Sequence, residues 1–180
     1  MTRAFLVWGP ATDHPELMAD PTRRALDDLA DRDVVHACSI DPEIADTATL
    51  VAKSGYPLQQ CANCVVVAGK RDGVERVAAL VVLAHTRADV NGVVRRTLDV
   101  RKLSFMSQEA AVERTGMEYG GITPLGLPPE WPIYVDAAVA HTDPVMIGSG
   151  LRRGKLELPG AVLAALPGAQ IIDGLARVAE

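Results

Sequence analysis

The sequence predicts a single α+β domain built on a mixed, curved β-sheet with flanking helices. Three observations support this prediction. The chain has 180 residues, which suits one domain. Its apolar residues make up 48% and its charged residues 23%, which is enough apolar material for one sizeable core. Strand and helix signals follow one another without the strict alternation of a doubly wound parallel sheet.

The first third of the chain predicts strand, helix, strand and helix in that order. Residues 4–8 and 34–40 are short apolar runs of strand length. Asp20-Pro21 and Asp41-Pro42 each place a capping side chain before a proline in the first helical turn. We expect the second of these helices to end at Gly55, because glycine commonly terminates helices.

The middle of the chain predicts a β-hairpin and a further strand, each followed by a helix. The strands are expected over residues 61–68, 74–84 and 102–106. G-K-R-D-G separates the first two runs, which are rich in valine, and fits a hairpin loop. Asp89 can cap the helix after the hairpin, while Ser107 opens a second helix that ends at Gly116.

The last third predicts short strands, over residues 132–136, 145–147, 155–158 and 170–173, and one helix over 159–166. Before them lies Y-G-G-I-T-P-L-G, residues 119–126. Glycine lets another group approach the main chain closely, and proline fixes φ and removes a donor. The segment therefore predicts an exposed backbone surface shaped for a ligand, with an irregular surface loop as the alternative.

Composition and charge limit the classes of function. Aromatic residues are only 4% of the chain, which argues against a platform that stacks several bases. The net charge of −5 argues against general coating of nucleic acid, although two basic clusters could contact a phosphate backbone. The N-terminal apolar run is too short for a signal peptide, and no segment reaches membrane-spanning length. Three cysteines fit a reducing cytoplasm.

The motif search predicts neither a metal nor a cofactor. Cys61 and Cys64 form a C-x-x-C pair, but V-V-V follows and puts the pair on a strand instead of at a helix N-terminus. No second pair completes a zinc site, and the four histidines lie apart in the sequence. A nucleophile elbow, a phosphate loop and a dinucleotide-binding glycine motif are all missing. Buried, reduced cysteines are the main interpretation, and a thiol protein is an alternative.

Several segments, taken in order, resemble one protein family. They are C-A-N-C-V-V-V, H-T-R-A-D-V-N, S-Q-E-A-A-V-E-R-T-G, Y-G-G-I-T-P-L-G, Y-V-D-A and I-G-S-G-L-R-R-G-K-L-E-L-P. Their order resembles the YbaK-type family of aminoacyl-tRNA deacylases, which includes the editing domain of bacterial prolyl-tRNA synthetases. The resemblance covers residues 44–176, so we expect residues 1–43 to form an N-terminal extension packed on that domain.

The resemblance implies a curved, partly barrel-like mixed sheet and hydrolysis of the ester between a wrong amino acid and its tRNA. An ester is already activated, so water can be the nucleophile without a catalytic triad or a metal. Backbone amides of the loop from Gly120 to Pro124 would stabilise the carbonyl oxygen. The expected partners are an aminoacyl-tRNA and an aminoacyl-tRNA synthetase, in the cytoplasm and away from membranes.

The resemblance also assigns the site. Catalytic roles are expected for Asn63, Gly120, Gly121 and Ser149. The expected substrate-binding residues are Thr86, Ile122, Thr123, Pro124, Asp136 and Gly150. The acceptor-stem phosphates are expected to meet the two basic clusters, Arg95, Arg96, Arg152, Arg153 and Lys155. For Asp136, a structural cap on the following A-A-V-A fits the sequence equally well.

One position departs from the family pattern. Many members carry a lysine at the start of the strand after the first matched helix, where this chain has Asn63. Asparagine is a neutral donor and acceptor, so a charge-assisted hydrogen bond is lost, and such bonds are roughly twice as strong as neutral ones. Lys53 and Lys70 lie too far along the chain to fill the position directly. The alternative function is therefore a non-catalytic module that binds an aminoacyl-tRNA end, a nucleotide or an amino-acid derivative.

Overall fold

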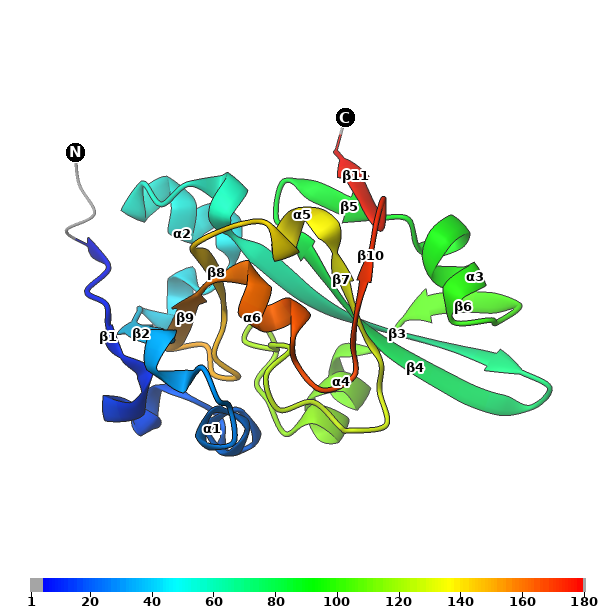
Figure 1. Ribbon diagram of the computed structural model, residues 1–180, viewed down its shortest axis with the longest axis horizontal. Coiled ribbons are helices and arrows are strands. Elements are labelled where there is room, and N and C mark those ends of the chain that lie inside the picture. The colour runs from blue at the N-terminus through cyan, green and yellow to red at the C-terminus, as the bar shows by residue number, and fades with distance from the viewer. Residues whose placement is uncertain (1–4, 180) are drawn as a thin grey trace.

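The predicted hairpin is the centre of the fold (Figure 1). In the computed structural model, which describes residues 5–179, β3 (Ala62–Arg71) pairs antiparallel with β4 (Val74–Leu83). Asp72 and Gly73 turn the chain with φ of 50° and 82°, the positive values that tight hairpin turns need. Along β4, alternate side chains enter two different apolar clusters, so both faces of the sheet are covered.

The hairpin is extended on both sides into a mixed five-stranded sheet with the order β10-β7-β4-β3-β6. β7 (Ile133–Asp136) runs parallel to β4, and β10 (Ala169–Ile172) runs parallel to β7. β6 (Lys102–Phe105) is antiparallel to β3. The predicted α+β class with a mixed sheet is confirmed, and the strands within residues 5–179 form three separate sheets without closing a barrel.

A second sheet has the order β1-β2-β9-β8 and is antiparallel throughout. Its strands are β1 (Gly9–Pro10), β2 (His36–Ser39), β8 (Val145–Gly148) and β9 (Gly154–Leu158). A parallel bridge between Cys61 and Met146 brings β8 to the beginning of β3, so the two sheets meet there. The third sheet pairs β5 (Thr86–Ala88) with β11 (Ala176–Val178).

Helices flank the sheets, and only some of them begin at the predicted caps: the first has Ala19 as its N-cap, so Asp20 is its first residue instead of its cap. They are α1 (Asp20–Asp27), α2 (Thr47–Ser54), a π-helical turn (Val90–Val94) that continues into α3 (Arg95–Thr97), α4 (Gln108–Thr115), α5 (Ala137–Ala140) and α6 (Gly160–Ala164). Ser107 caps α4 and Asp89 caps the π-helical turn, as predicted. None of the helices within residues 5–179 is long and apolar enough to cross a membrane.

Two N-terminal elements differ from the prediction. α2 begins at Thr47 and not at residue 41, because Asp46 is the cap: its carboxylate accepts a hydrogen bond from the Thr49 amide at 2.9 Å. Asp41 caps only a short 3-10 turn, Pro42–Ile44. The strand predicted over residues 4–8 is not found over 5–8, and residue 4 lies outside the described residues.

The largest core cluster joins the two main sheets. It includes Leu26 of α1, Val81 of β4, Val135 of β7, Leu156 of β9 and Leu163 of α6. The residues before position 44 therefore contribute both core side chains and the strands β1 and β2. The division of the chain at residues 43 and 44 stays a prediction.

Asp136 ends β7 and ties three elements together. It is 7% exposed, and one carboxylate oxygen accepts a hydrogen bond from the Ala138 amide of α5 at 2.9 Å. The other oxygen accepts one from the Ala176 amide of β11 at 2.8 Å. Both oxygens are thus used to hold the main chain, which is the structural-cap alternative considered from the sequence.

Replacing Asp136 should therefore weaken the fold. Asp136→Ala leaves two amides without acceptors and should lower the free energy of unfolding by about 1–3 kcal/mol. Urea denaturation measures this change, with Asp173→Ala as the matched control because Asp173 is exposed just after β10. An effect of Asp136→Ala no larger than that of the control would contradict the assignment.

Candidate functional site

A cavity of about 580 Å³ opens where the two main sheets meet. One wall is the beginning of α2, and a second is the first half of β3. The remaining walls are the glycine-rich loop and the adjacent ends of β8 and β9. The residues used below are Asp46, Thr47, Asn63, Cys64, Tyr119, Gly120, Ile122, Gly148, Arg152 and Lys155, all of which line this cavity.

Strand register explains why Asn63 and Lys155 face the same space. The Cys61–Met146 bridge is parallel, so two residues further along each strand Asn63 comes beside Gly148. Gly148 is in turn the antiparallel partner of Lys155. Side chains in one such row lie on the same face of a sheet. Gly148 has no side chain, and the main chain of the glycine-rich loop lies over it, while the side chains of Asn63 and Lys155 line the cavity on either side.

The glycine-rich loop lies directly against the connection between β8 and β9. A side-chain Cβ at Gly148 would lie 2.5 Å from the Gly121 carbonyl oxygen, and one at Gly121 would lie 2.8 Å from the Leu151 main chain. The Gly150 amide donates to the Gly121 carbonyl at 2.7 Å, and the Glu118 amide donates to the Gly150 carbonyl at 2.8 Å. This close approach is the reason for the glycines that the sequence concentrates here.

The two glycine amides of the loop have different surroundings. The Gly121 amide donates to the Glu118 carbonyl at 2.9 Å, within the turn of the loop. The Gly120 amide makes no hydrogen bond within residues 5–179, and Gly120 lines the cavity with a φ of 86°. Gly120 therefore has an amide that is free to donate to a ligand, whereas the hydrogen-bonded Gly121 fixes the shape of the loop.

Two cations belong to the cavity. Lys155 is only 6% exposed, and its ammonium donates to the Ala45 carbonyl at 3.0 Å. Burial lowers the pKa of Lys155, and this effect is partly offset by the nearby Cys61, Cys38 and Asp46. The Arg152 guanidinium donates to the Pro42 carbonyl at 2.7 Å and to the Tyr119 carbonyl at 3.4 Å.

The start of α2 contributes polar groups to the same cavity. The Thr47 hydroxyl donates to the side-chain carbonyl of Asn63 at 3.0 Å, which fixes the orientation of the amide. Hydrogen bonds from the hydroxyl and amide of Thr49 lower the pKa of Asp46, so this carboxylate is ionised at neutral pH. The cavity therefore combines a buried cation, an exposed carboxylate and a neutral amide.

Of the predicted site residues, Asn63, Gly120, Ile122, Arg152 and Lys155 converge on the cavity. The structure places Lys155 inside the fold instead of on the surface, where the sequence grouped it with Arg153 as a contact for phosphates. Arg153 is exposed, and its guanidinium donates to the Glu16 carbonyl at 2.8 Å. Arg95 and Arg96 lie in α3, which flanks β6 away from the cavity (Figure 1).

The other ten predicted site residues do not line the cavity. Besides Arg95, Arg96, Arg153 and Pro124 they are six residues, five of which hold the main chain or pack elsewhere. Ser149 is fully buried, with its hydroxyl directed to the Leu151 carbonyl at 3.2 Å. Gly121 and Gly150 form the hydrogen bond that holds the glycine-rich loop against the connection between β8 and β9. The Thr86 hydroxyl donates to the Leu83 carbonyl at 2.7 Å, and Asp136 caps α5. Thr123 is the sixth: it is fully buried, and its hydroxyl has no hydrogen-bond partner within residues 5–179.

Pro124 belongs to a different cavity, of about 200 Å³, which lies between α1 and Trp131. Tyr119, Thr47 and Gly148 are cavity residues that the sequence reasoning missed. Tyr119 stands within the quoted glycine-rich octet and could have been noticed there. Thr47 and Gly148 reach the cavity only through tertiary pairing, for which the sequence carries no local signal.

The chain matches the aminoacyl-tRNA editing domain family over residues 41–166 and belongs to that family. The resemblance predicted from the sequence is confirmed. No curated relative matches the chain.

Three solved structures are similar to the chain at 22% identity, which supports the fold. The first is a candidate trans-editing enzyme for prolyl tRNA synthetase, with a TM-score of 0.71 over 87% of this chain and 97% of that chain. The second is a scaffold protein used for computational epitope grafting, with a TM-score of 0.71 over 86% of this chain and 95% of that chain. The third is a hypothetical protein, with a TM-score of 0.64 over 74% and 85% of the two chains.

The cysteines should react slowly in the native protein. Burial raises the pKa of Cys38 and Cys64 to about 12 and that of Cys61 to about 11, so all three are neutral thiols at pH 7.5. Mass spectrometry after iodoacetamide treatment at pH 7.5 should show little labelling, with faster labelling as the pH rises toward those values. The urea-unfolded chain is the control and should label fully at pH 7.5. Native labelling as fast as that of a free thiol would revive the thiol-protein alternative.

Proposed function

We propose that this protein is an aminoacyl-tRNA deacylase that acts in trans on a misacylated tRNA. The observation that carries the proposal is the convergence of Gly120, Asn63 and Lys155 on one cavity in a chain of the editing-domain family. A volume of about 580 Å³ lies within the range of small-molecule sites, and it suits the aminoacylated terminal nucleotide of a tRNA. The rest of the tRNA would remain outside the cavity.

In the proposed reaction, water is the nucleophile. The thiols nearest the cavity are protonated, because burial raises their pKa values, and the Ser149 hydroxyl is turned toward the main chain. Attack on an ester develops negative charge on its carbonyl oxygen, and a preorganised amide donor stabilises that charge. The Gly120 amide is the proposed donor, because it makes no hydrogen bond within residues 5–179 and the hydrogen bonds of Gly121 hold the loop in place before the substrate arrives.

Asn63 would orient the water or the terminal ribose. Its side-chain carbonyl is occupied by the Thr47 hydroxyl, so its NH₂ group is the part that can donate to a ligand. Lys155 adds positive charge on the other side of Gly148. The cavity thus contains donors from three separate elements, β3, β9 and the glycine-rich loop.

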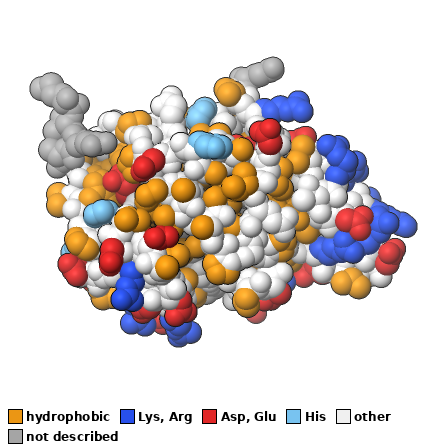
Figure 2. Space-filling model, viewed as in Figure 1, with side chains coloured by type: hydrophobic (Ala, Val, Ile, Leu, Met, Phe, Trp, Pro, Cys, Tyr) orange, Lys and Arg blue, Asp and Glu red, His pale blue; other side chains and the backbone are white. Residues whose placement is uncertain are grey.

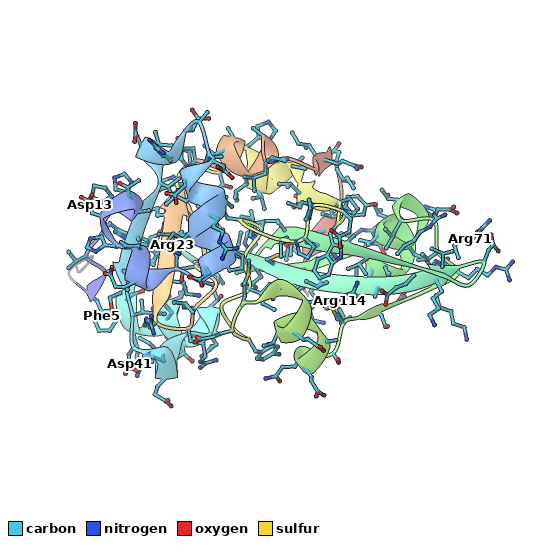
Figure 3. The ribbon with its side chains drawn as sticks, turned by 90° about the horizontal axis from the view of Figure 1, so that it is seen from below. Phe5, Asp13, Arg23, Asp41, Arg71 and Arg114 are labelled. Atoms are coloured by element: carbon cyan, nitrogen blue, oxygen red, sulfur yellow. The ribbon has the colours of Figure 1, made fainter. Side chains whose placement is uncertain are left out.

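The outer surface offers a path for the acceptor stem. Figure 2 shows Lys and Arg side chains gathered, among acidic ones, at the end of the molecule where the hairpin closes, and Figure 3 places Arg71 at that tip. The ten residues of β3 span about 30 Å between the cavity and this end. Arg71 and Arg76 are paired with Asp99, whereas the neighbouring Arg95, Arg96, Lys70, Arg101 and Lys102 are exposed and make no ion pair within residues 5–179. These exposed cations are the proposed contacts for tRNA phosphates.

A second candidate function is a module that binds the aminoacyl-tRNA end without hydrolysing it. The observation that favours it is the state of the site itself: Asn63 is uncharged, and the Gly121 amide is already used within the loop. The two candidates separate on a panel of aminoacylated tRNAs incubated with the protein. Release of one amino acid supports the deacylase, while saturable binding without release supports the module.

Gly120 provides the sharpest variant for the deacylase. Gly120→Leu should lower hydrolysis by about a hundredfold or more, as much as one lost oxyanion donor costs, because its side chain would fill the cavity next to Arg152 and its strained positive φ would turn the amide away from the ester. Gly174→Leu is the matched control, because Gly174 also has a positive φ but has no atom near its missing Cβ. The two variants should lose similar thermal stability. Full hydrolysis by Gly120→Leu would contradict the assignment.

A further inference from the structure

The ammonium of Lys155 is buried without an ion-pair partner. No carboxylate lies within 4.0 Å of it among residues 5–179, and its one hydrogen bond, to the Ala45 carbonyl, uses one of its three N–H groups. Asp46 is near enough to favour the charged form but is engaged with Thr49. A buried charge with so little compensation is costly to the folded protein. An anionic ligand in the cavity would supply the missing partner.

Arg152 adds a second cation to the same cavity. Its positive charge disfavours the charged form of Lys155, which places the two groups within electrostatic reach of each other. Two nearby carboxylates accept from neutral donors and form no ion pair with these cations within residues 5–179: Glu118 accepts from the Arg152 main-chain amide at 2.7 Å, and Glu157 accepts from the Tyr56 hydroxyl at 2.6 Å. One anion placed between Lys155 and Arg152 would relieve this repulsion and satisfy both groups.

Tyr119 stands at the rim of this cationic region. It is 53% exposed although it lines the cavity, and its carbonyl accepts a hydrogen bond from Arg152. The main-chain contacts of Glu118, Gly121 and Arg152 hold the loop on either side of it. An exposed aromatic ring beside a phosphate-binding cation is suited to pack against a nucleobase.

We propose that the cavity holds a 5′-phosphorylated adenosine, with Lys155 and Arg152 binding its phosphate and Tyr119 packing against its base. The inference rests on the proposed function, because the terminal nucleotide of a tRNA carries these groups. It goes further because it assigns the positive charge, which Asn63 lacks, to Lys155 on a different strand, β9. Asn63 and Lys155 line the same cavity on either side of Gly148, so a cation at either position faces the same ligand.

Adenosine 5′-monophosphate tests the subsite without any turnover. Calorimetric titration of the wild-type protein compares this nucleotide with adenosine, which lacks the phosphate, and with ribose 5-phosphate, which lacks the base. Both shortened ligands should bind at least about tenfold more weakly, as expected for a lost charge-assisted hydrogen bond or a lost stacking contact. Equal affinity for adenosine, or no binding of the nucleotide at millimolar concentration, would overturn the proposal.

Substitution of Lys155 tests whether its ammonium binds the phosphate of the nucleotide. Lys155→Met should weaken binding of the nucleotide by about tenfold to a hundredfold and leave adenosine unaffected. Lys53→Met is the matched control, because it makes the same change at an exposed lysine of α2 outside the cavity. Nucleotide binding by Lys155→Met as tight as that of the wild type would overturn the assignment.

The double variant Asn63→Lys/Lys155→Met removes the ammonium at position 155 and places one at position 63, on the other side of Gly148. It should recover at least part of the lost affinity for the nucleotide, because the new ammonium lines the same cavity. Thermal unfolding of each variant separates a lost contact from a lost fold, and the ligand comparison on the wild type decides the outcome if Lys155→Met does not fold. Nucleotide binding without ester hydrolysis would keep this inference and remove the deacylase, so the two failures are distinguishable.

Discussion

The site depends on one contact between two stretches of main chain that leave no room for side chains. Gly121 presses against Gly148 and Leu151, and the Gly150 amide locks the contact with a hydrogen bond of 2.7 Å. This contact joins the glycine-rich loop to the connection between β8 and β9. It thereby sets the distance between the Gly120 amide and the ends of the strands. A Cβ at Gly121 or Gly148 would push the glycine-rich loop away from the connection between β8 and β9.

The N-terminal residues support this contact from behind. The Ala19 amide donates to the Ser149 carbonyl at 3.1 Å, and a Cβ at Gly150 would collide with Ala19 and Thr22. β2 lies beside β9 and thus backs the strand that carries Lys155. A buried lysine needs such a well-packed setting, because a mobile wall would let the ammonium move out to water, where its charge is better solvated. Packing on two sides therefore holds the ammonium in the cavity.

Local signals predicted most of the fold and only part of the site. Caps such as Ser107 and Asp89, the valine-rich hairpin and the glycine-rich loop are encoded within a few residues each, and the structure contains them. Lys155 differs most from the prediction, because its neighbours Arg152 and Arg153 indicated a basic cluster on the surface. Its burial follows from the pairing of β9 with β2 and β8, and strands distant in sequence give no local sign of pairing. Asp136 shows the converse, since a carboxylate that leaves a strand looks the same whether it binds a ligand or caps a helix.

The most direct test of the account is a crystal structure with a non-hydrolysable aminoacyl-adenosine 5′-phosphate analogue. The account predicts the analogue in the cavity between α2, β3 and the glycine-rich loop. Its carbonyl oxygen should lie about 3 Å from the Gly120 amide nitrogen, and its phosphate should contact the Lys155 ammonium. An analogue bound elsewhere, for instance in the cavity between α1 and Trp131, would contradict the account. So would a carbonyl oxygen that points away from the glycine-rich loop.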